Sequence, residues 1–323
     1  MIAPNLGSDL GWLTEVDPRL EVLDANALAQ DIDGGKPLLE RAEVILLGYP
    51  VPRGIVERAP HLRWVQHTQA GVSNLHGTDL WDSPVTLTSS RGAVAATGIA
   101  EYVIAGAYYF ASGLNEATRQ KAAGEFSRRG YALRTLTGAT IGIVGLGGIG
   151  AEVARLARAA GMRVVATRRS VASPQRDAEG VDLLLPADRI AELAAASDFV
   201  AVCAQLTPAT QGMIGAEVLA AMKPHSVLIN IARGEVIDED ALVAALQAGR
   251  IAGAVLDVYA GELAGRPPRR DLVELPQVVL TPHISGLGDA SGDEPVKQLF
   301  AENLRRYLEG QPLLNLVDRS RGY

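Results

Sequence analysis

The sequence has a single cysteine, Cys203, and only five histidines, at positions 61, 67, 76, 225 and 283. One cysteine cannot form an intrachain disulfide, and no group of His and Cys has the spacing of zinc ligands. We therefore expect neither a disulfide framework nor a bound metal. Cys203 lies in the apolar run 199–204, which favours a buried strand residue over a reactive thiol.

Long apolar runs, a basic N-terminus and an excess of positive charge are also missing. The longest apolar stretch, near residues 102–111, is far shorter than the roughly 20 residues that a membrane span needs. The first residues lack the basic and apolar regions of a signal peptide. Thirty Lys and Arg against 37 Asp and Glu give a net charge of −7, which disfavours nucleic acid or an anionic membrane as a partner. These features predict a cytoplasmic protein.

The length and composition are those of a globular chain with about two domains. The chain has 323 residues, of which 48% are hydrophobic and 21% charged. Short apolar runs at 20–23, 42–48, 62–67 and 85–89 alternate with helical patterns and predict a small α/β lobe. A long helical pattern then starts at Thr97, the predicted N-cap, and continues to residue 124.

The pattern from residue 140 onward is a regular alternation of strands and helices. Runs rich in Val, Ile and Leu occur at 141–144, 163–167, 199–204, 226–231, 253–258 and 277–280. Continuous apolar strands of this kind are typical of a parallel sheet covered on both faces. The last helix, over 294–309, places Val296, Leu299, Phe300, Leu304 and Leu308 on one face, and we expect it to return the chain to the first lobe.

A glycine-rich turn connects the strand at 141–144 to the next helix. Gly145, Gly147 and Gly150 match the pattern G-x-G-x-x-G. The first glycine permits a tight turn, the second lets the backbone approach a pyrophosphate, and the third allows the helix to pack closely on the strand. The strand, helix and second strand at the expected spacing favour a dinucleotide site over an ordinary glycine turn.

The end of the second strand indicates which dinucleotide is bound. An acidic residue is expected there when the ligand is NAD, but the sequence has Arg168 and Arg169. Two guanidinium groups can bind the additional phosphate of NADP by charge-assisted, bidentate hydrogen bonds. Thr167 and Ser170 are further hydroxyl donors. We therefore expect a preference for NADP(H), with NAD(H) as a second possible cofactor.

Three polar residues stand at or just beyond the ends of later strands, namely Arg233, Glu262 and His283. Each by itself is compatible with an ordinary role in a turn, a loop or a cap. Open α/β sheets, however, bind their ligands at the carboxyl ends of parallel strands, where these three side chains can converge. A histidine, a carboxylate and an arginine together suit the reduction of a carbonyl group, because the developing oxyanion needs a proton donor and a fixed cation.

The order of these motifs resembles that of the D-isomer-specific 2-hydroxyacid dehydrogenase family, which includes glyoxylate/hydroxypyruvate reductases and phosphoglycerate dehydrogenases. The resemblance covers nearly the whole chain. Its segments are LRWVQHTQAGV, RGAVAATGIAEYV, the glycine turn, LTPATQGMIG, MKPHSVLINIARGEVIDEDALVAAL, GAVLDV and TPHISG. It implies an enzyme that interconverts a 2-keto acid and a D-2-hydroxy acid by hydride transfer.

The resemblance also implies the roles of individual residues. Arg233 corresponds to the substrate-binding arginine, His283 to the acid/base, and Glu262 to the carboxylate that orients the histidine and favours its imidazolium form. The amides of Ala70 and Gly71 correspond to groups that hold the substrate carboxylate, and Asp257 to a residue facing the nicotinamide carboxamide. The remaining implied cofactor contacts are Gly148, Ile149, Leu206, Thr207, Pro208, Ile231 and Ala232.

The implied fold is α/β, with two doubly wound parallel-sheet domains. A Rossmann coenzyme domain, 101–285, is inserted in a flavodoxin-like substrate domain formed by 1–100 and 286–323. Tyr49, Arg91 and Tyr102 are candidates to line the pocket from the first lobe, whereas His67 is interpreted as a structural or substrate-lining residue. The alanine-rich helix from Thr97 and the segment to Leu136 resemble the dimerisation region of the family, so we expect a homodimer.

Two other functions fit the same motifs. Some transcriptional corepressors resemble this family and bind dinucleotides without catalysis, but they carry long additional tails. Formate and phosphite dehydrogenases share the architecture, and the formate enzymes pair their histidine with glutamine, where this sequence has Glu262. The acid favours keto-acid chemistry. The identity of the keto acid does not follow from the sequence, because a difference of one methylene changes discrimination by only about 1–3 kcal/mol.

Overall fold

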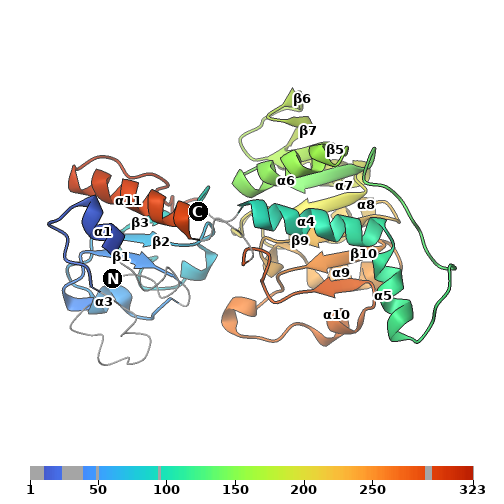
Figure 1. The fold of residues 1–323 in the computed structure, drawn as a ribbon, viewed down its shortest axis with the longest axis horizontal. Helices are drawn as coiled ribbons and strands as arrows, with labels where there is room; N and C mark the ends of the chain where they lie inside the picture. The colour runs from blue at the N-terminus through green and yellow to red at the C-terminus, as the bar shows by residue number, and fades with distance from the viewer. Residues whose placement is uncertain (1–10, 24–38, 49–50, 94–95, 288–292, 323) are drawn as a thin grey trace. The chain divides into compact units, whose positions relative to one another are not determined.

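The computed structural model describes residues 11–23, 39–48, 51–93, 96–287 and 293–322. The chain divides into two compact units (Figure 1). Unit 1 comprises Met1–Val94 and Ser291–Tyr323, and unit 2 comprises Ala95–Ala290. Within the described ranges, no helix is both long and apolar enough to cross a membrane.

Unit 1 is built on a parallel sheet of three strands in the order β1-β2-β3. The central strand has all four of its side chains buried, and Val65 lies opposite Ile45 and Leu87 in the register of the sheet. The elements of this unit are α1 (Gly11–Val16), β1 (Val44–Leu47), α3 (Ile55–Arg58), β2 (Trp64–His67), η2 (Ser73–Leu75), β3 (Thr86–Ser89) and α11 (Glu294–Leu308).

Helix α11 packs on the sheet of unit 1 through aromatic and amide side chains. The ring of Trp64 lies 5.3 Å from that of Phe300 and 5.5 Å from that of Tyr307, measured between centroids. Asn303, which is fully buried, donates to Gln66 at 2.9 Å. Val296 and Leu304 are buried as expected, but Leu299 is only half-buried and Leu308 is 39% exposed.

The strand expected at residues 20–23 is wrong. The chain turns after Asp17, whose carbonyl oxygen accepts from the N–H of Leu20 at 3.2 Å, and residues 20–23 form neither a helix nor a strand. Leu20 and Val22 instead pack as partly buried side chains against the cluster that contains Trp64 and Phe300. The apolar alternation therefore reflects packing of an irregular segment on the core.

Unit 2 contains an eight-stranded sheet in the order β11-β10-β9-β8-β4-β5-β7-β6, in which every pair is parallel except β6 with β7. The strands are β4 (Thr140–Val144), β5 (Arg163–Arg168), β6 (Gln175–Ala178), β7 (Val181–Pro186), β8 (Phe199–Val202), β9 (Val227–Asn230), β10 (Gly253–Leu256) and β11 (Val278–Leu280). The strand order reverses between β8 and β4. Such a switch point is where open α/β sheets bind ligands.

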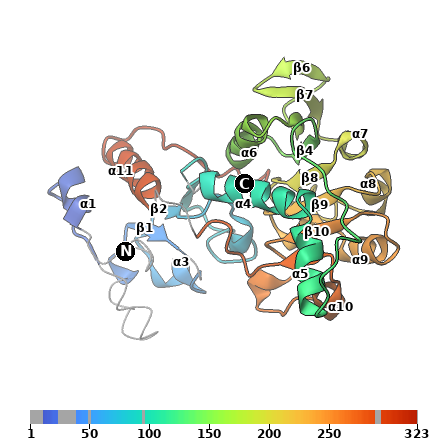
Figure 2. The ribbon, with the colours of Figure 1, turned by 45° about the vertical axis from the view of Figure 1, so that its right-hand side comes forward.

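Helices cover both faces of this sheet, which makes the unit doubly wound (Figures 1 and 2). On one face, α4 and α6 pack on Ile141 and Ile143 of β4. On the other face, α7, α8 and α9 pack on Val144 and on β8 and β9. The helices are α4 (Ala96–Ala111), α5 (Leu114–Ala122), α6 (Gly148–Ala159), α7 (Ile190–Ala196), α8 (Ala216–Ala221), η3 (Gly234–Val236), α9 (Glu239–Gln247), η4 (Glu262–Ala264) and α10 (Arg270–Glu274).

The single long helix predicted from Thr97 is two helices, α4 and α5. The break falls at Gly113, which has φ of 73°, a left-handed conformation that only glycine adopts without strain. Thr97 is not the N-cap either, since α4 begins at Ala96, and the Thr97 hydroxyl donates to Glu152 of α6 at 3.0 Å. Cys203 lies one residue beyond β8, not inside it, and is half-buried.

Candidate active site

The carboxyl ends of the parallel strands bring the predicted site residues of unit 2 to one edge of the sheet. The glycine turn follows β4, Arg168 ends β5, and Leu206, Thr207 and Pro208 follow β8. Further along the same edge, Ile231, Ala232 and Arg233 follow β9, Asp257 follows β10, and His283 follows β11. Parallel strands place their ends together in this way regardless of the distances in sequence.

The three glycines of the turn meet different surroundings. Gly145 has φ of 99°, and a Cβ atom there would lie 3.0 Å from the backbone of Ala204. A Cβ on Gly150 would lie 2.3 Å from the carbonyl oxygen of Gly145, so only glycine lets the helix approach the turn. Gly147 differs, because a Cβ there would meet nothing within 4 Å. Gly145 and Gly150 are thus required by the fold, whereas Gly147 leaves open space for a ligand.

Helix α6 starts directly in this turn. Its N-cap is Gly147, and no side chain caps the helix, so its first amides are available to an anion. Gly148 and Ile149, two of the predicted contacts, are in this first turn. The hydroxyl of Thr167 accepts from the N–H of Gly145 at 3.3 Å, and the side chain is 2% exposed, so Thr167 holds the turn from β5. The turn therefore fits the pyrophosphate of a dinucleotide.

The predicted phosphate-binding residues stand at the end of β5. Arg169 and Ser170 are exposed, and Arg168 is half-buried. The guanidinium of Arg168 forms an ion pair with the carboxylate of Glu179, from the turn between β6 and β7. The hairpin of β6 and β7 and this ion pair were not expected from the sequence.

The loop after β8 is stabilised by threonine hydroxyls. The N–H of Thr207 donates to Thr210 Oγ1 at 2.8 Å, and Thr210 donates to the carbonyl oxygen of Gln205 at 2.6 Å. Cys203, at the start of this loop, is joined to β4 by a bond from its N–H to the Val144 carbonyl of 2.9 Å. Burial raises the pKa of the Cys203 thiol to about 12, so it is a neutral thiol at physiological pH.

His283 and Glu262 form the pair that the sequence predicted. His283 Nδ1 lies 2.9 Å from Glu262 Oε1. The Glu262 side chain is 8% exposed, whereas that of His283 is 42% exposed. The contact places a buried carboxylate beside one ring nitrogen and leaves Nε2 for a substrate.

Asp257 holds the loop that carries His283. Its carboxylate, which is fully buried, accepts from the Thr281 hydroxyl at 2.6 Å and from the N–H groups of Ile284 and Ser285 at 2.8 and 3.0 Å. The N–H of His283 donates to the Asp257 carbonyl at 2.8 Å. These bonds hold His283 at φ of 55°, a conformation that is unusual for a residue other than glycine.

Tyr102 extends this network to α4. Its hydroxyl lies 2.6 Å from Thr281 Oγ1. Because the Thr281 proton is donated to Asp257, Tyr102 is the donor in this contact. Burial raises the pKa of Tyr102. Tyr102 was expected in the first lobe, but α4 belongs to unit 2, where the residue supports the histidine loop.

Two further carboxylates hold the loop that carries Glu262. The N–H of Ala260 donates to Glu239 at 2.8 Å, and the N–H of Gly261 donates to Glu235 at 2.9 Å. Burial raises the pKa of Glu239. The backbone of the same loop lies against Gly234, where a Cβ would be 1.9 Å from the backbone of Tyr259. No local sequence pattern indicates these contacts, because Glu235 lies in η3 and Glu239 begins α9, both far along the chain from the loop they hold.

Arg233 is placed by the buried side chain of Asn230 at the end of β9. Asn230 Nδ2 donates to the Arg233 carbonyl at 2.9 Å, and Asn230 Oδ1 accepts from the N–H of Ala232 at 3.0 Å. Burial lowers the pKa of Arg233, and the negative charges of Glu262 and Glu235 oppose that shift. An arginine pKa starts so high that Arg233 remains a cation at the edge that also carries His283.

Several of the predicted site residues belong to unit 1. Ala70 and Gly71 are half-buried in the loop after β2, and in the described part of the chain their N–H groups donate to no protein acceptor. His67 is fully buried, with Nδ1 3.0 Å from the Leu47 carbonyl and Nε2 3.2 Å from Asn74 Oδ1, which is a structural role. Arg91 is exposed, and Tyr49 lies outside the described residues.

Comparison with known proteins tests the family resemblance. Residues 104–285 match the sequence model of the D-isomer specific 2-hydroxyacid dehydrogenase, NAD binding domain. A glyoxylate reductase of Thermococcus onnurineus is 36% identical over 286 residues, covering 86% of this chain and 83% of that protein. A D-3-phosphoglycerate dehydrogenase of Methanocaldococcus jannaschii is 31% identical over 85% of this chain, which spans only 51% of that relative.

A solved structure agrees over the full length. The D-isomer specific 2-hydroxyacid dehydrogenase of Xanthobacter autotrophicus, in complex with NADPH and MES, has a TM-score of 0.78 and 28% identity, with 100% of both chains covered. The fold class expected from the sequence, α/β with parallel sheets and a Rossmann unit, is confirmed. The chain belongs to the D-isomer specific 2-hydroxyacid dehydrogenase family and is an NAD(P)-dependent oxidoreductase of 2-keto and 2-hydroxy acids.

Proposed function

We propose that the protein reduces a small 2-keto acid, with glyoxylate and hydroxypyruvate as the first candidates, to the D-2-hydroxy acid, and that NADPH is its preferred reductant. The observation that carries the proposal is the contact of 2.9 Å between His283 Nδ1 and Glu262 Oε1, at the sheet edge where Arg233 also lies. In this proposal unit 2 binds the dinucleotide and unit 1 contributes to substrate binding.

His283 is the proton donor in the reductive direction. The reduced nicotinamide, when bound, supplies a hydride to the carbonyl carbon, and negative charge then develops on the carbonyl oxygen. With Nδ1 against Glu262, the imidazolium gives the proton on Nε2 to that oxygen, and the product is a 2-hydroxy acid. The ring becomes neutral in this step, and it must take up a proton before the next turnover.

Arg233 binds the anionic substrate. Its guanidinium can donate to the carboxylate and to the keto oxygen in a bidentate arrangement, which orients the carbonyl group and stabilises the developing charge. Ala70 and Gly71 offer two backbone donors in one loop, a suitable arrangement for a carboxylate. Asp257 is proposed to act toward the nicotinamide only through the loop it organises, because its carboxylate is fully buried by Thr281, Ile284 and Ser285.

The preference for NADPH rests on Arg168 and Arg169. Both stand at the end of β5, in the place where an NAD-selective carboxylate is expected on that strand. The relative of known structure from Xanthobacter autotrophicus was solved with NADPH. A 2′-phosphate bound by a guanidinium contributes about 1.5–3 kcal/mol, which corresponds to tens to hundreds of fold in affinity.

A panel of 2-keto acids with each reduced dinucleotide tests the proposal. Glyoxylate, hydroxypyruvate, pyruvate and 3-phosphohydroxypyruvate are compared by kcat/KM, with NADPH and NADH in parallel. We expect the first two to be the best substrates and NADPH to be used at least tenfold better than NADH, about 1.4 kcal/mol. A larger kcat/KM for pyruvate or 3-phosphohydroxypyruvate contradicts the proposed substrates, and a larger kcat/KM with NADH contradicts the proposed cofactor.

The variant Arg233→Ala separates substrate binding from cofactor binding. We expect keto-acid reduction to fall by at least about 10²-fold, because an interaction with the developing oxyanion is lost, while the Kd for NADPH changes little. Arg270→Ala is the matched control, since that arginine is exposed and pairs with Glu274 on α10. Turnover close to that of the unmodified enzyme removes Arg233 from the site.

We also propose that the protein is a homodimer. Four large apolar side chains on and after α4 and α5 are strongly exposed, namely Tyr108, Leu114, Phe126 and Leu133. In Figure 1 the segment after α5 runs along the outside of unit 2 before it enters β4. Light scattering after gel filtration tests the assembly, and Phe126→Ser is expected to weaken it. A monomer at micromolar concentration contradicts this proposal.

A further inference from the structure

The hairpin of β6 and β7 carries a carboxylate to the proposed phosphate site. It lies at one edge of the sheet of unit 2, beside β5, where Thr167 is paired with Leu185 and Arg168 with Pro186 (Figures 1 and 2). Its turn consists of Glu179 and Gly180, between the paired residues Ala178 and Val181. Glu179 Oε2 accepts from Arg168 Nη1, so the hairpin delivers an acid that β5 itself lacks.

The backbone of this turn is an unusual one for glutamate. Glu179 has φ of 50° and Gly180 has φ of 77°, which is the pattern of a type I′ turn. Asn-Gly and Asp-Gly are preferred there, because Asn and Asp tolerate positive φ and longer side chains do so less well. Glutamate keeps the conformation at a cost but reaches further than Asn or Asp. The contact with Arg168 therefore accounts for a glutamate at position 179, whereas the turn conformation does not.

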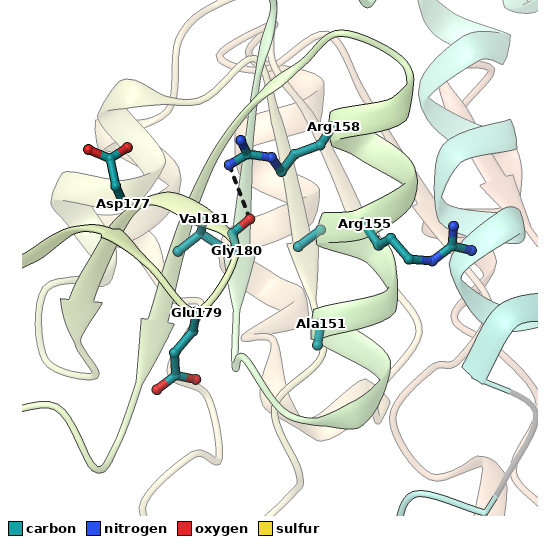
Figure 3. Close-up of a pocket in the computed structure, with 8 residues that line it drawn as sticks. Ala151, Arg155, Arg158, Asp177, Glu179, Gly180 and Val181 are labelled. Atoms are coloured by element: carbon teal, nitrogen blue, oxygen red, sulfur yellow. Dashed lines mark hydrogen bonds between the residues drawn. The ribbon is translucent and has the colours of Figure 1, made fainter.

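Helix α6 fixes the position of the same turn. Arg158 of α6 donates to the Gly180 carbonyl at 3.2 Å and lies 3.8 Å from Asp182 of β7 (Figure 3). Figure 3 also shows that the Glu179 side chain extends away from Arg158. A cavity of about 470 Å³ lies between α6 and the hairpin, lined by Ala151, Ala154, Arg155, Arg158, Asp177, Glu179, Gly180 and Val181. The Glu179 carboxylate thus stands on a turn that is hydrogen-bonded to α6, the helix that begins at the glycine turn.

We propose that Glu179 sets the discrimination between NADP(H) and NAD(H). The inference rests on the proposed role of Arg168 as a ligand of the 2′-phosphate. Glu179 occupies Nη1 of Arg168, so a phosphate that binds this guanidinium competes with the carboxylate for its charge and lies near a second negative group. Without the phosphate the ion pair stays intact, and the carboxylate is an acceptor for a ribose hydroxyl. Glu179 therefore weakens NADP(H) binding and supports NAD(H) binding, so that it reduces the preference for NADPH without reversing it.

Binding titrations of the apoprotein test this proposal without turnover. The Kd values for NADPH and NADH are measured by nucleotide fluorescence and by calorimetry, in the unmodified protein and in Glu179→Gln. We expect the variant to bind NADPH about three- to fivefold more tightly, because the competing pair is exposed and weak, and to bind NADH equally or less tightly. Asp177→Asn is the matched control, since Asp177 stands on the same hairpin and also has positive φ.

Arg168→Ala and the double variant distinguish the possible failures. If Arg168→Ala weakens NADPH binding and Glu179→Gln leaves it unchanged, the role of Glu179 is overturned and the phosphate site stands. If Arg168→Ala leaves NADPH binding unchanged, both the phosphate site and the role of Glu179 are overturned. In the Arg168→Ala background, Glu179→Gln is expected to have no effect on NADPH. An equal tightening by Asp177→Asn indicates a general charge effect and also overturns the proposal.

Discussion

The two halves of the ligand edge in unit 2 are constructed differently. At the ends of β4 and β5, the site consists of backbone amides, glycines and two arginines, one half-buried and one exposed. At the ends of β9, β10 and β11, each functional side chain stands on a loop that a buried or half-buried polar residue holds. Asn230 holds the loop of Arg233, Glu235 and Glu239 hold that of Glu262, and Asp257 holds that of His283.

The difference follows from what each half has to do. An anion is bound by any set of converging donors, so backbone amides at a helix start suffice and few side chains are needed. Proton transfer needs one atom in one place, and an error of about 1 Å in the position of a catalytic group costs a large part of the rate. The catalytic half therefore requires polar side chains that fix its loops, and its variants are expected to affect kcat more than binding.

The largest expected effect is that of His283→Asn. Asparagine tolerates the positive φ of this position, so the fold is expected to be retained. Loss of the proton donor should lower kcat by about 10²- to 10⁴-fold, with little change in the Kd for NADPH. Steady-state kinetics and a fluorescence titration measure the two quantities. His225→Asn is the control, because that exposed histidine pairs with Asp198 on the same unit, and a kcat close to normal in His283→Asn contradicts the assignment.

A pair of glycine variants tests the dinucleotide half. In Gly147→Ala the new Cβ meets no atom within 4 Å and φ is −98°, so the melting temperature should stay the same while NADPH binding weakens by about tenfold or more. In Gly150→Ala the Cβ lies 2.3 Å from a carbonyl oxygen, and the protein should be destabilised by about 1–3 kcal/mol. Thermal unfolding and titration separate the two. If Gly147→Ala binds NADPH normally, the pyrophosphate does not lie against this glycine.

Much of the fold could be predicted because the central strands of unit 2 are fully buried. All four side chains of β8 and of β9 are buried, and such runs are recognisable without any partner. The β6 strand was missed because three of its four side chains are exposed, and its sequence, QRDA, has no apolar alternation. The end of the helix at Ala111 was missed because one glycine in an alanine-rich segment does not by itself indicate a break.

In the candidate site, the catalytic residues could be predicted from the sequence, but the residues that support them could not. The catalytic residues could be predicted because each follows an apolar strand in a parallel sheet, and strand ends meet. Their supports could not, because Tyr102 and Thr281 are 179 positions apart and no local pattern connects them. The ion pair of Arg168 with Glu179 depends on a hairpin that the sequence does not reveal. Buried polar contacts between distant segments leave no periodic signal.

A moderate effect is expected when the support of His283 is weakened. Thr281→Val removes the donor to Asp257 and the acceptor of Tyr102, and it should lower kcat by about tenfold through loss of a buried hydrogen-bond network of roughly 1–2 kcal/mol. Tyr102→Phe removes only the outer bond and should lower kcat by about two- to threefold. Stopped-flow single turnovers measure the chemical step. Equal KM values for NADPH in both variants are expected, and a selective rise in that KM contradicts a positioning role.

The smallest effect on catalysis is expected for substitution of Cys203, whose backbone lies against Gly145 of the glycine turn. Burial raises the pKa of its thiol from an ordinary 9.0 to about 12. The native thiol therefore stays protonated at pH 8, so alkylation should be far slower than in the unfolded chain. Because the native state keeps the proton that the unfolded state loses, the free energy of unfolding should fall by up to about 1.4 kcal/mol per pH unit between pH 9 and 12. Cys203→Ser should reduce this slope, part of which comes from the raised pKa values of Tyr102 and Tyr307, and should leave kcat unchanged. Native labelling at the rate of a free thiol shows instead that the turn opens readily, and the dinucleotide half is then less rigid than the catalytic half.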